Sequence, residues 1–108
     1  MDTHKTYQLG GPDAGLRMDD VMKMFRYGFR TIGGFAAERI LEHGDTVEYD
    51  LAGGHSVTIK PLHEDSAIEV SVSAAGDDDK EAAEAEALIR EEIESIIYID
   101  YRAGYCCE

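Results

Sequence analysis

The sequence predicts a two-layer α+β fold in which two helices pack on one face of a small antiparallel sheet. Two patterns indicate this. Residues 45–73 alternate between apolar and polar side chains, which is typical of strands that bury one face. Residues 19–43 and 77–101 repeat their apolar side chains every three or four positions, as core-facing helices do. A chain of 108 residues is long enough for one such domain and too short for two.

Residues 1–18 are expected to form a lead-in of strand and turn. Thr6 to Leu9 show a weak alternation and make a candidate fourth strand at the N-terminal edge of the sheet. Residues 10–15 contain three glycines and one proline, which mark a turn. Because the Lys-Ser/Thr pair of a P-loop is missing, this glycine-rich stretch does not predict a phosphate site.

Residues 19–43 predict a broken helix that begins at an aspartate cap, Asp19 or Asp20. Gly33 and Gly34 interrupt it, since each glycine inside a helix costs about 1 kcal/mol relative to alanine. A second helical segment is therefore expected from Phe35 to His43. Its core-facing side chains, together with those of the first segment, would be Val21, Met22, Phe25, Phe29, Ile32, Ala36 and Ile40.

Residues 45–73 predict three strands joined as an antiparallel meander, at 46–51, 56–60 and 68–73. A glycine-containing turn at 52–55 and a connection at 61–66 separate them. The side chains expected to face the core are Val47, Tyr49, Leu51, Val57, Ile59, Ile68, Val70 and Val72.

Residues 77–101 predict an acidic helix, followed by a tail at 102–108. Its apolar stripe consists of Ala82, Ala85, Ile89, Ile93, Ile96 and Ile97, with Leu88 at the margin. Carboxylates fill the rest of the surface, and three aspartates stand at the N-terminus, where the helix dipole favours negative charge. The predicted common core is Phe25, Phe29, Ile32, Tyr49, Ile59, Val70, Ile89, Ile93 and Ile96.

The net charge of −13 is placed unevenly along the chain. Residues 1–43 carry six acidic and six basic side chains, whereas residues 44–108 carry 17 acidic and 4 basic ones. Such a field repels nucleic acid and anionic membranes and attracts basic partners. No apolar run has the length of a membrane span, the first residues do not resemble a signal peptide, and the adjacent Cys106 and Cys107 suit reduced thiols. A cytoplasmic location is expected.

No motif predicts a reaction or a cofactor. The histidines His4, His43, His55 and His63 do not have ligand spacing with one another or with the two cysteines, so no zinc site is predicted. Residues 77–79 do not have the alternating ligands of a calcium loop, and no serine has a nucleophile-elbow context. A non-enzymatic protein without metal or cofactor is therefore expected.

Two resemblances bear on function. The αβββα order is similar to the topology of double-stranded-RNA-binding domains, but the C-terminal helix that would face RNA is acidic here, which opposes RNA binding. In size, acidity and lack of catalytic motifs, mainly over residues 45–101, the chain resembles small phage-encoded nucleic-acid-mimic inhibitors, anti-CRISPR proteins among them. This resemblance implies an inhibitor that occupies the basic nucleic-acid-binding groove of a protein and does not itself bind nucleic acid.

The candidate contact residues follow from the helical pattern. The carboxylates expected to lie farthest from the apolar stripe are Asp77, Asp78, Asp79, Glu84, Glu91 and Glu94. An alternative remains open, in which the chain is a soluble adaptor or a homodimer whose interface contains Tyr98 and Tyr101, and the charge serves solubility. Salt distinguishes the two, because only binding through charge weakens steeply with ionic strength.

Overall fold

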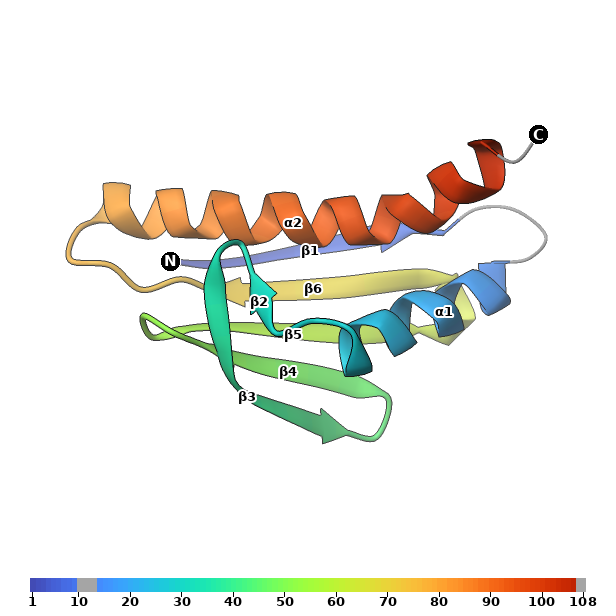
Figure 1. Ribbon diagram of the computed structural model, residues 1–108, viewed down its shortest axis with the longest axis horizontal. Coiled ribbons are helices and arrows are strands. Elements are labelled where there is room, and N and C mark those ends of the chain that lie inside the picture. Colours follow the sequence, from blue (N-terminus) through green and yellow to red (C-terminus); the bar gives the residue numbers. More distant parts are fainter. Residues whose placement is uncertain (10–13, 107–108) are drawn as a thin grey trace.

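The computed structural model describes the backbone of residues 1–9 and 14–106 and the side chains of residues 1–9 and 17–98. The fold is α+β, with a curled antiparallel sheet of six strands and two helices (Figure 1). In chain order the elements are β1 (Asp2–Gln8), α1 (Ala14–Tyr27), β2 (Thr31–Ile32), β3 (Phe35–His43), β4 (Thr46–Leu51), β5 (His55–Leu62), a 3-10 turn (His63–Asp65), β6 (Ala67–Ser73) and α2 (Asp79–Cys106). The strand order across the sheet is β1-β6-β5-β4-β3-β2.

The three strands of the predicted meander are present as β4, β5 and β6, but the sheet is larger than predicted, with six strands in the described residues instead of three or four. Tyr49 stands opposite Val57, and Val57 stands opposite Val72, so the apolar side chains of the three strands line up on one face. The candidate N-terminal strand is also confirmed and is longer than the pattern indicated. It runs antiparallel to β6, with Asp2 opposite Ser73 and Gln8 opposite Ala67.

The prediction of a second helical segment at 35–43 is wrong. These residues form β3, which pairs with β4, and the short β2 precedes it in a hairpin. Gly33 and Gly34 do not interrupt a helix. They form the hairpin turn with φ values of +64° and +88°, the left-handed conformation that two-residue hairpin turns require. The preceding helix, α1, begins earlier than Asp19, at Ala14, and ends at Tyr27.

Gly33 also fixes where this hairpin lies. A side chain at position 33 would place its Cβ 2.8 Å from the backbone nitrogen of Ile89, so only glycine permits the turn to approach α2 this closely. The Gly33 N–H donates to Glu92 Oε1 at 2.8 Å. The β2–β3 hairpin is thereby held against the middle of α2, which Figure 1 shows running along the β1 side of the sheet.

The core lies between the sheet and the two helices, and the predicted apolar stripe of α2 is buried in it. Ile93 has no exposed surface, whereas Leu88, at the margin of the stripe, is 50% exposed. Of the predicted common core, Phe29 is only partly buried and packs against the others. The core cluster includes eight of the predicted residues, Phe25, Ile32, Tyr49, Ile59, Val70, Ile89, Ile93 and Ile96.

Helix α2 begins as its sequence indicates and ends later than expected. Asp78 caps it, with Oδ1 accepting the Glu81 N–H at 2.7 Å, and Glu81 Oε2 accepts the Asp77 N–H at 3.4 Å. The helix continues to Cys106, so most of the tail expected at 102–108 is helical.

Replacing Ile93 by alanine should lower the free energy of unfolding by about 2–5 kcal/mol, because it leaves a cavity in the core. Leu88→Ala on the same helix is the matched control and should cost less than about 1 kcal/mol, since this side chain is half exposed. Urea unfolding followed by circular dichroism measures both. Equal losses would mean that α2 presents a different face to the sheet.

Candidate functional site

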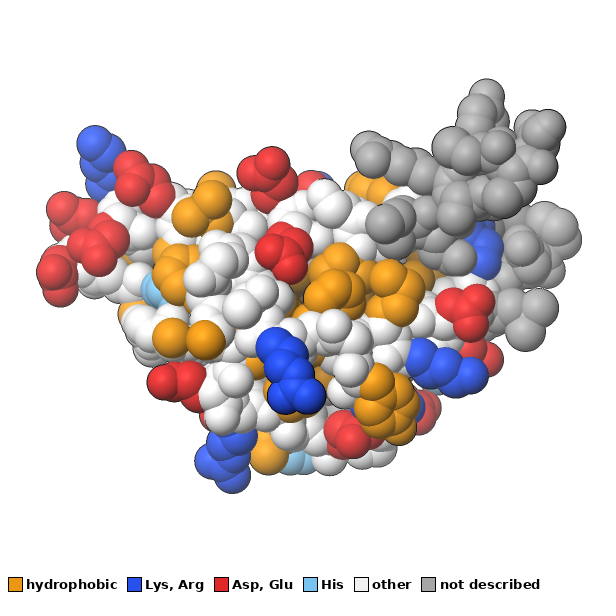
Figure 2. Space-filling model, viewed as in Figure 1, with side chains coloured by type: hydrophobic (Ala, Val, Ile, Leu, Met, Phe, Trp, Pro, Cys, Tyr) orange, Lys and Arg blue, Asp and Glu red, His pale blue; other side chains and the backbone are white. Residues whose placement is uncertain are grey.

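Exposed carboxylates gather where α2 begins. Figure 2 shows acidic side chains crowded at that end of the molecule. Asp77, Asp79, Glu84 and Glu91 are all exposed, and within the described part of the chain none of their carboxylates forms a hydrogen bond or an ion pair. These four side chains are therefore available to an external cation.

The other two candidate carboxylates, Asp78 and Glu94, form hydrogen bonds within the domain. Asp78 is exposed but caps the helix. Glu94 does not lie on the outer side of α2 as the helical pattern indicated, since its side chain is only 30% exposed and faces β1. Its Oε2 accepts the Tyr7 hydroxyl at 2.6 Å and the Lys5 ammonium at 3.3 Å. The Tyr7 hydroxyl, and then Lys5, hold the pKa of Glu94 below its ordinary value.

The contact of Glu94 belongs to a polar network that joins β1 to α2. Arg90 is its centre and donates to Glu86 at 2.9 Å, to the Thr3 hydroxyl at 2.7 Å and to the Tyr7 hydroxyl at 3.1 Å. Burial, followed by the hydrogen bond to Glu94, raises the pKa of Tyr7 to about 12. The acidic side chains on this flank of α2 thus stabilise the fold by holding β1 beside the helix.

The candidate tyrosines lie farther along α2. Tyr98 is 45% exposed, and its ring meets the Tyr7 ring edge to face with centroids 6.3 Å apart. The side chain of Tyr101 lies outside the described residues. One face of Tyr98 is thus used within the domain, and the remainder is accessible.

A cleft of about 500 Å³ opens beside the exposed carboxylates. Its walls come from Phe35 at the start of β3, from Gly53 and His55 around the β4–β5 turn, and from residues in the range 75–88. His55 was expected in the turn at 52–55 and outside any zinc site, yet it is the first residue of β5 and is buried, with 6% of its surface exposed. Its burial depends on three separate segments, and no local sequence signal indicates it.

The hydrogen bond of His55 sets its tautomer. Nδ1 accepts the Ala75 N–H at 2.9 Å, so the neutral ring carries its proton on Nε2. The ring also contacts the Phe35 ring, with centroids 4.4 Å apart at 63°. His55 can therefore act as a hydrogen-bond donor through Nε2, while this tautomer leaves no lone pair on Nε2 for a metal.

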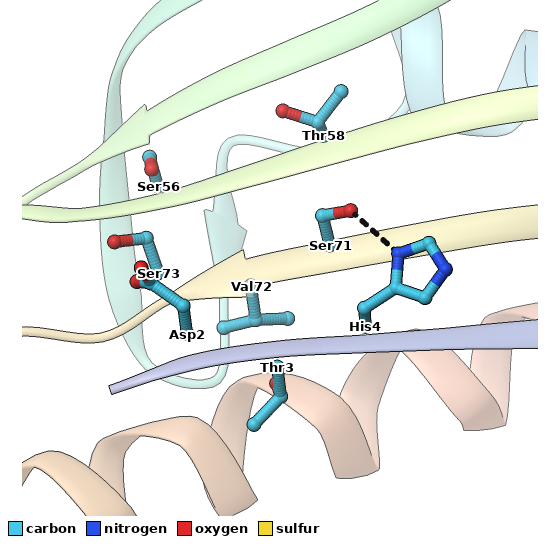
Figure 3. Close-up of a pocket in the computed structure, with 8 residues that line it drawn as sticks. All are labelled: Asp2, Thr3, His4, Ser56, Thr58, Ser71, Val72 and Ser73. Carbon is cyan, nitrogen blue, oxygen red and sulfur yellow. Dashed lines mark hydrogen bonds between the residues drawn. The ribbon is translucent and has the colours of Figure 1, made fainter.

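The face of the sheet opposite the helices carries a second, smaller hollow of about 350 Å³ (Figure 3). Hydroxyl groups line it, from Ser56 and Thr58 on β5 and from Ser71 and Ser73 on β6. His4 Nδ1 lies 3.4 Å from Ser71 Oγ. Thr3, by contrast, points toward α2, where it joins the network around Arg90.

His4 and Ser71 of this hollow, together with the neighbouring Glu69, have the composition of a catalytic triad. Glu69 Oε2 lies 3.7 Å from His4 Nε2, and the other ring nitrogen faces Ser71. However, His4 is exposed, and β6 pairs with β1 on one side and with β5 on the other. The backbone donors beside Ser71 are therefore used within the sheet and do not form an oxyanion hole. We assign no reaction to these residues.

Neither α1 nor α2, within the residues the structure describes, is long and apolar enough to cross a membrane. In that same part of the chain, no three histidine, cysteine or acidic side chains are grouped so that they could hold a metal ion.

Glu94→Gln should lower stability at neutral pH by about 0.5–1 kcal/mol, a small value because solvent screens this partly exposed pair. Since the pKa of Glu94 is lowered by folding, its contribution is complete above about pH 4.3 and is lost as the pH falls through the lower folded value. The difference from the parent should thus shrink between neutral and acidic pH. Denaturant unfolding at both pH values measures it, with the exposed Glu91→Gln as control; an equal loss in the control would contradict the assignment.

No protein-family model matches this sequence, and no curated protein is significantly similar to it. The resemblance to small acidic phage-encoded inhibitors therefore remains one of size, charge and composition. Any function assigned to the chain has to follow from the positions and chemistry of its own side chains.

Proposed function

We propose that this protein is a non-enzymatic acidic inhibitor that binds the basic nucleic-acid-binding groove of a protein target, in the manner of an anti-CRISPR protein. The observation that carries the proposal is the set of exposed, unpaired carboxylates just before α2 and on its first half, namely Asp77, Asp79, Glu84 and Glu91. Their charges are not neutralised within the described part of the domain, so they favour a partner that supplies lysine or arginine side chains.

The spacing of these carboxylates resembles a short patch of phosphate charge more than the long row of phosphates along duplex DNA. Glu84 and Glu91 are seven residues apart, about 10 Å along a helix that rises roughly 1.5 Å per residue. Duplex DNA presents one charge per roughly 1.7 Å of its axis, so the outer side of α2 imitates only a few phosphates. The aspartates at the start of the helix add charge at one end, and the proposed contact is concentrated there.

The proposal reassigns two of the candidate residues. Asp78 and Glu94 act within the fold, as helix cap and as partner of β1, and their contribution to binding would be indirect. Direct binding of the protein to nucleic acid remains excluded from the proposal, because the net charge of −13 repels phosphate.

A soluble adaptor or homodimer is the second candidate. The exposed ring of Tyr98 favours it, because tyrosine commonly anchors protein interfaces. In that case the acidic surface would serve solubility, and the affinity for the partner would depend only weakly on salt.

The test compares two triple charge reversals with the same change in net charge. Asp77, Glu84 and Glu91 are changed to lysine in one variant, and the exposed Asp20, Glu38 and Glu64 in the other. The first should weaken binding to a target isolated from the native host by at least about tenfold, because like charges would then meet across the interface. The second should change it by less than about threefold, the share expected from long-range charge alone.

Displacement of labelled nucleic acid from the target, followed by fluorescence anisotropy, gives the affinities. The parent should lose affinity steeply between roughly 0.05 and 0.3 M salt. If both variants bind like the parent, or if salt has little effect, the mimicry proposal is wrong and the interface around Tyr98 becomes the better account.

A further inference from the structure

The cleft beside the start of α2 contains a donor, on a buried side chain, that the rest of the described fold does not use. His55 is 94% buried, and its Nε2 donates to no other group among the described residues, while Nδ1 is occupied by Ala75. A Cβ at Gly53 would lie 2.9 Å from Nε2, and Gly53 lines the same cleft. Glycine at this position, where φ is +91°, therefore leaves the Nε2–H open toward the cleft.

The rim of the cleft has the opposite polarity. Asp77 and Glu84 line it with carboxylates that have no partner in the described part of the chain. Phe35, whose ring contacts that of His55, and the half-exposed Leu88 add apolar surface to the lining. A molecule that fills the cleft would thus meet negative charge at the mouth, an apolar wall along its length and one N–H donor at the base.

We propose that this cleft receives an arginine or lysine side chain from an extended basic segment of the protein partner. The cationic head would pair with Asp77 and Glu84, the aliphatic stem would lie along Phe35 and Leu88, and a neighbouring backbone carbonyl would accept the His55 Nε2–H. This inference rests on the proposed function and specifies which chemical group of the basic groove is recognised.

The volume and polarity of the cleft favour this occupant over others. About 500 Å³ is within the usual range of ligand pockets and takes a long side chain together with flanking backbone. A polyamine would satisfy the carboxylates but has no acceptor for His55. An acidic peptide would supply acceptors but would be repelled by the rim.

The wall formed by Phe35 is held in place by the β2–β3 hairpin, which contacts α2 through Gly33 and Glu92. The cleft is therefore bounded by elements that are already fixed to one another in the free protein. Binding would not require them to be brought together, which lowers the entropic cost of association.

The test uses three probes on the full chain: a blocked pentapeptide with two arginines, the same peptide with glutamines in their place, and spermidine. Nuclear magnetic resonance titration follows the ring protons of His55 and the amide of Ala75. The arginine peptide should shift both signals, and the glutamine peptide should shift neither. Glu84→Gln should raise the dissociation constant of the arginine peptide about tenfold, the loss of one charge-assisted contact.

Two variants make the result specific. Glu64→Gln removes the same charge from the 3-10 turn and should change the dissociation constant by less than about twofold. His55→Asn keeps an acceptor for the Ala75 N–H and removes the Nε2 donor. It should therefore weaken binding of the arginine peptide but not binding of spermidine. Amide spectra that match the parent away from the cleft show that each variant is folded.

Several outcomes would overturn the inference. If Glu84→Gln and Glu64→Gln weaken peptide binding equally, the peptide responds to net charge and not to the cleft. If His55→Asn weakens spermidine binding as much as peptide binding, His55 does not act by donating to a peptide carbonyl. In either case the proposed function stands if the variant with lysine at positions 77, 84 and 91 fails to displace nucleic acid from the target. If Glu84→Gln releases the peptide while the triple variant inhibits like the parent, the cleft is a basic-peptide site and the proposed function is wrong.

Discussion

Burial of the isoleucine stripe of α2 against the sheet is the constraint on which the surface of this protein depends. Ile89, Ile93 and Ile97 are fully buried, so they fix the rotation of the helix about its own axis. That rotation decides which carboxylates face solvent and which meet β1. The same packing brings Ile89 against the β2–β3 hairpin and so sets one wall of the cleft at His55. The charged surface is thus a consequence of the apolar one.

The sequence predicted correctly those elements whose apolar residues fit either the helical repeat or the strand repeat, but not both. The alternation in β4, β5 and β6 does not fit a helix, and the long apolar stripe of α2 does not fit a strand. In the segment 32–40, Ile32, Ala36 and Ile40 recur every four residues, a spacing that fits one face of a helix and also one face of a strand. The Gly-Gly pair was the local signal for a hairpin, and pairing with β4 decided the outcome.

The candidate site shows the same limit. Helical geometry placed Asp79, Glu84 and Glu91 correctly on the exposed surface, because exposure on the outer side of a helix follows from the position of its apolar stripe. It misplaced Glu94, whose partners Lys5 and Tyr7 come from the opposite end of the chain. The cleft around His55 could not be predicted, since its walls come from β3, the β4–β5 turn and the start of α2. Contacts between distant segments carry no local pattern.

The short length of β2 has a consequence for the solubility of the protein. β2 pairs only with Phe35 and Ala36, and the Ala37 N–H donates to the Arg30 carbonyl, so in the described structure the outer edge of β3 from Glu38 to His43 has no neighbouring strand in the sheet. An open edge of this kind can recruit another chain into a continuous sheet and begin aggregation. This edge carries the charged residues Glu38, Arg39 and Glu42. A strand added there would have to place its own side chains next to these charges. Charge along this edge therefore also opposes edge-to-edge association.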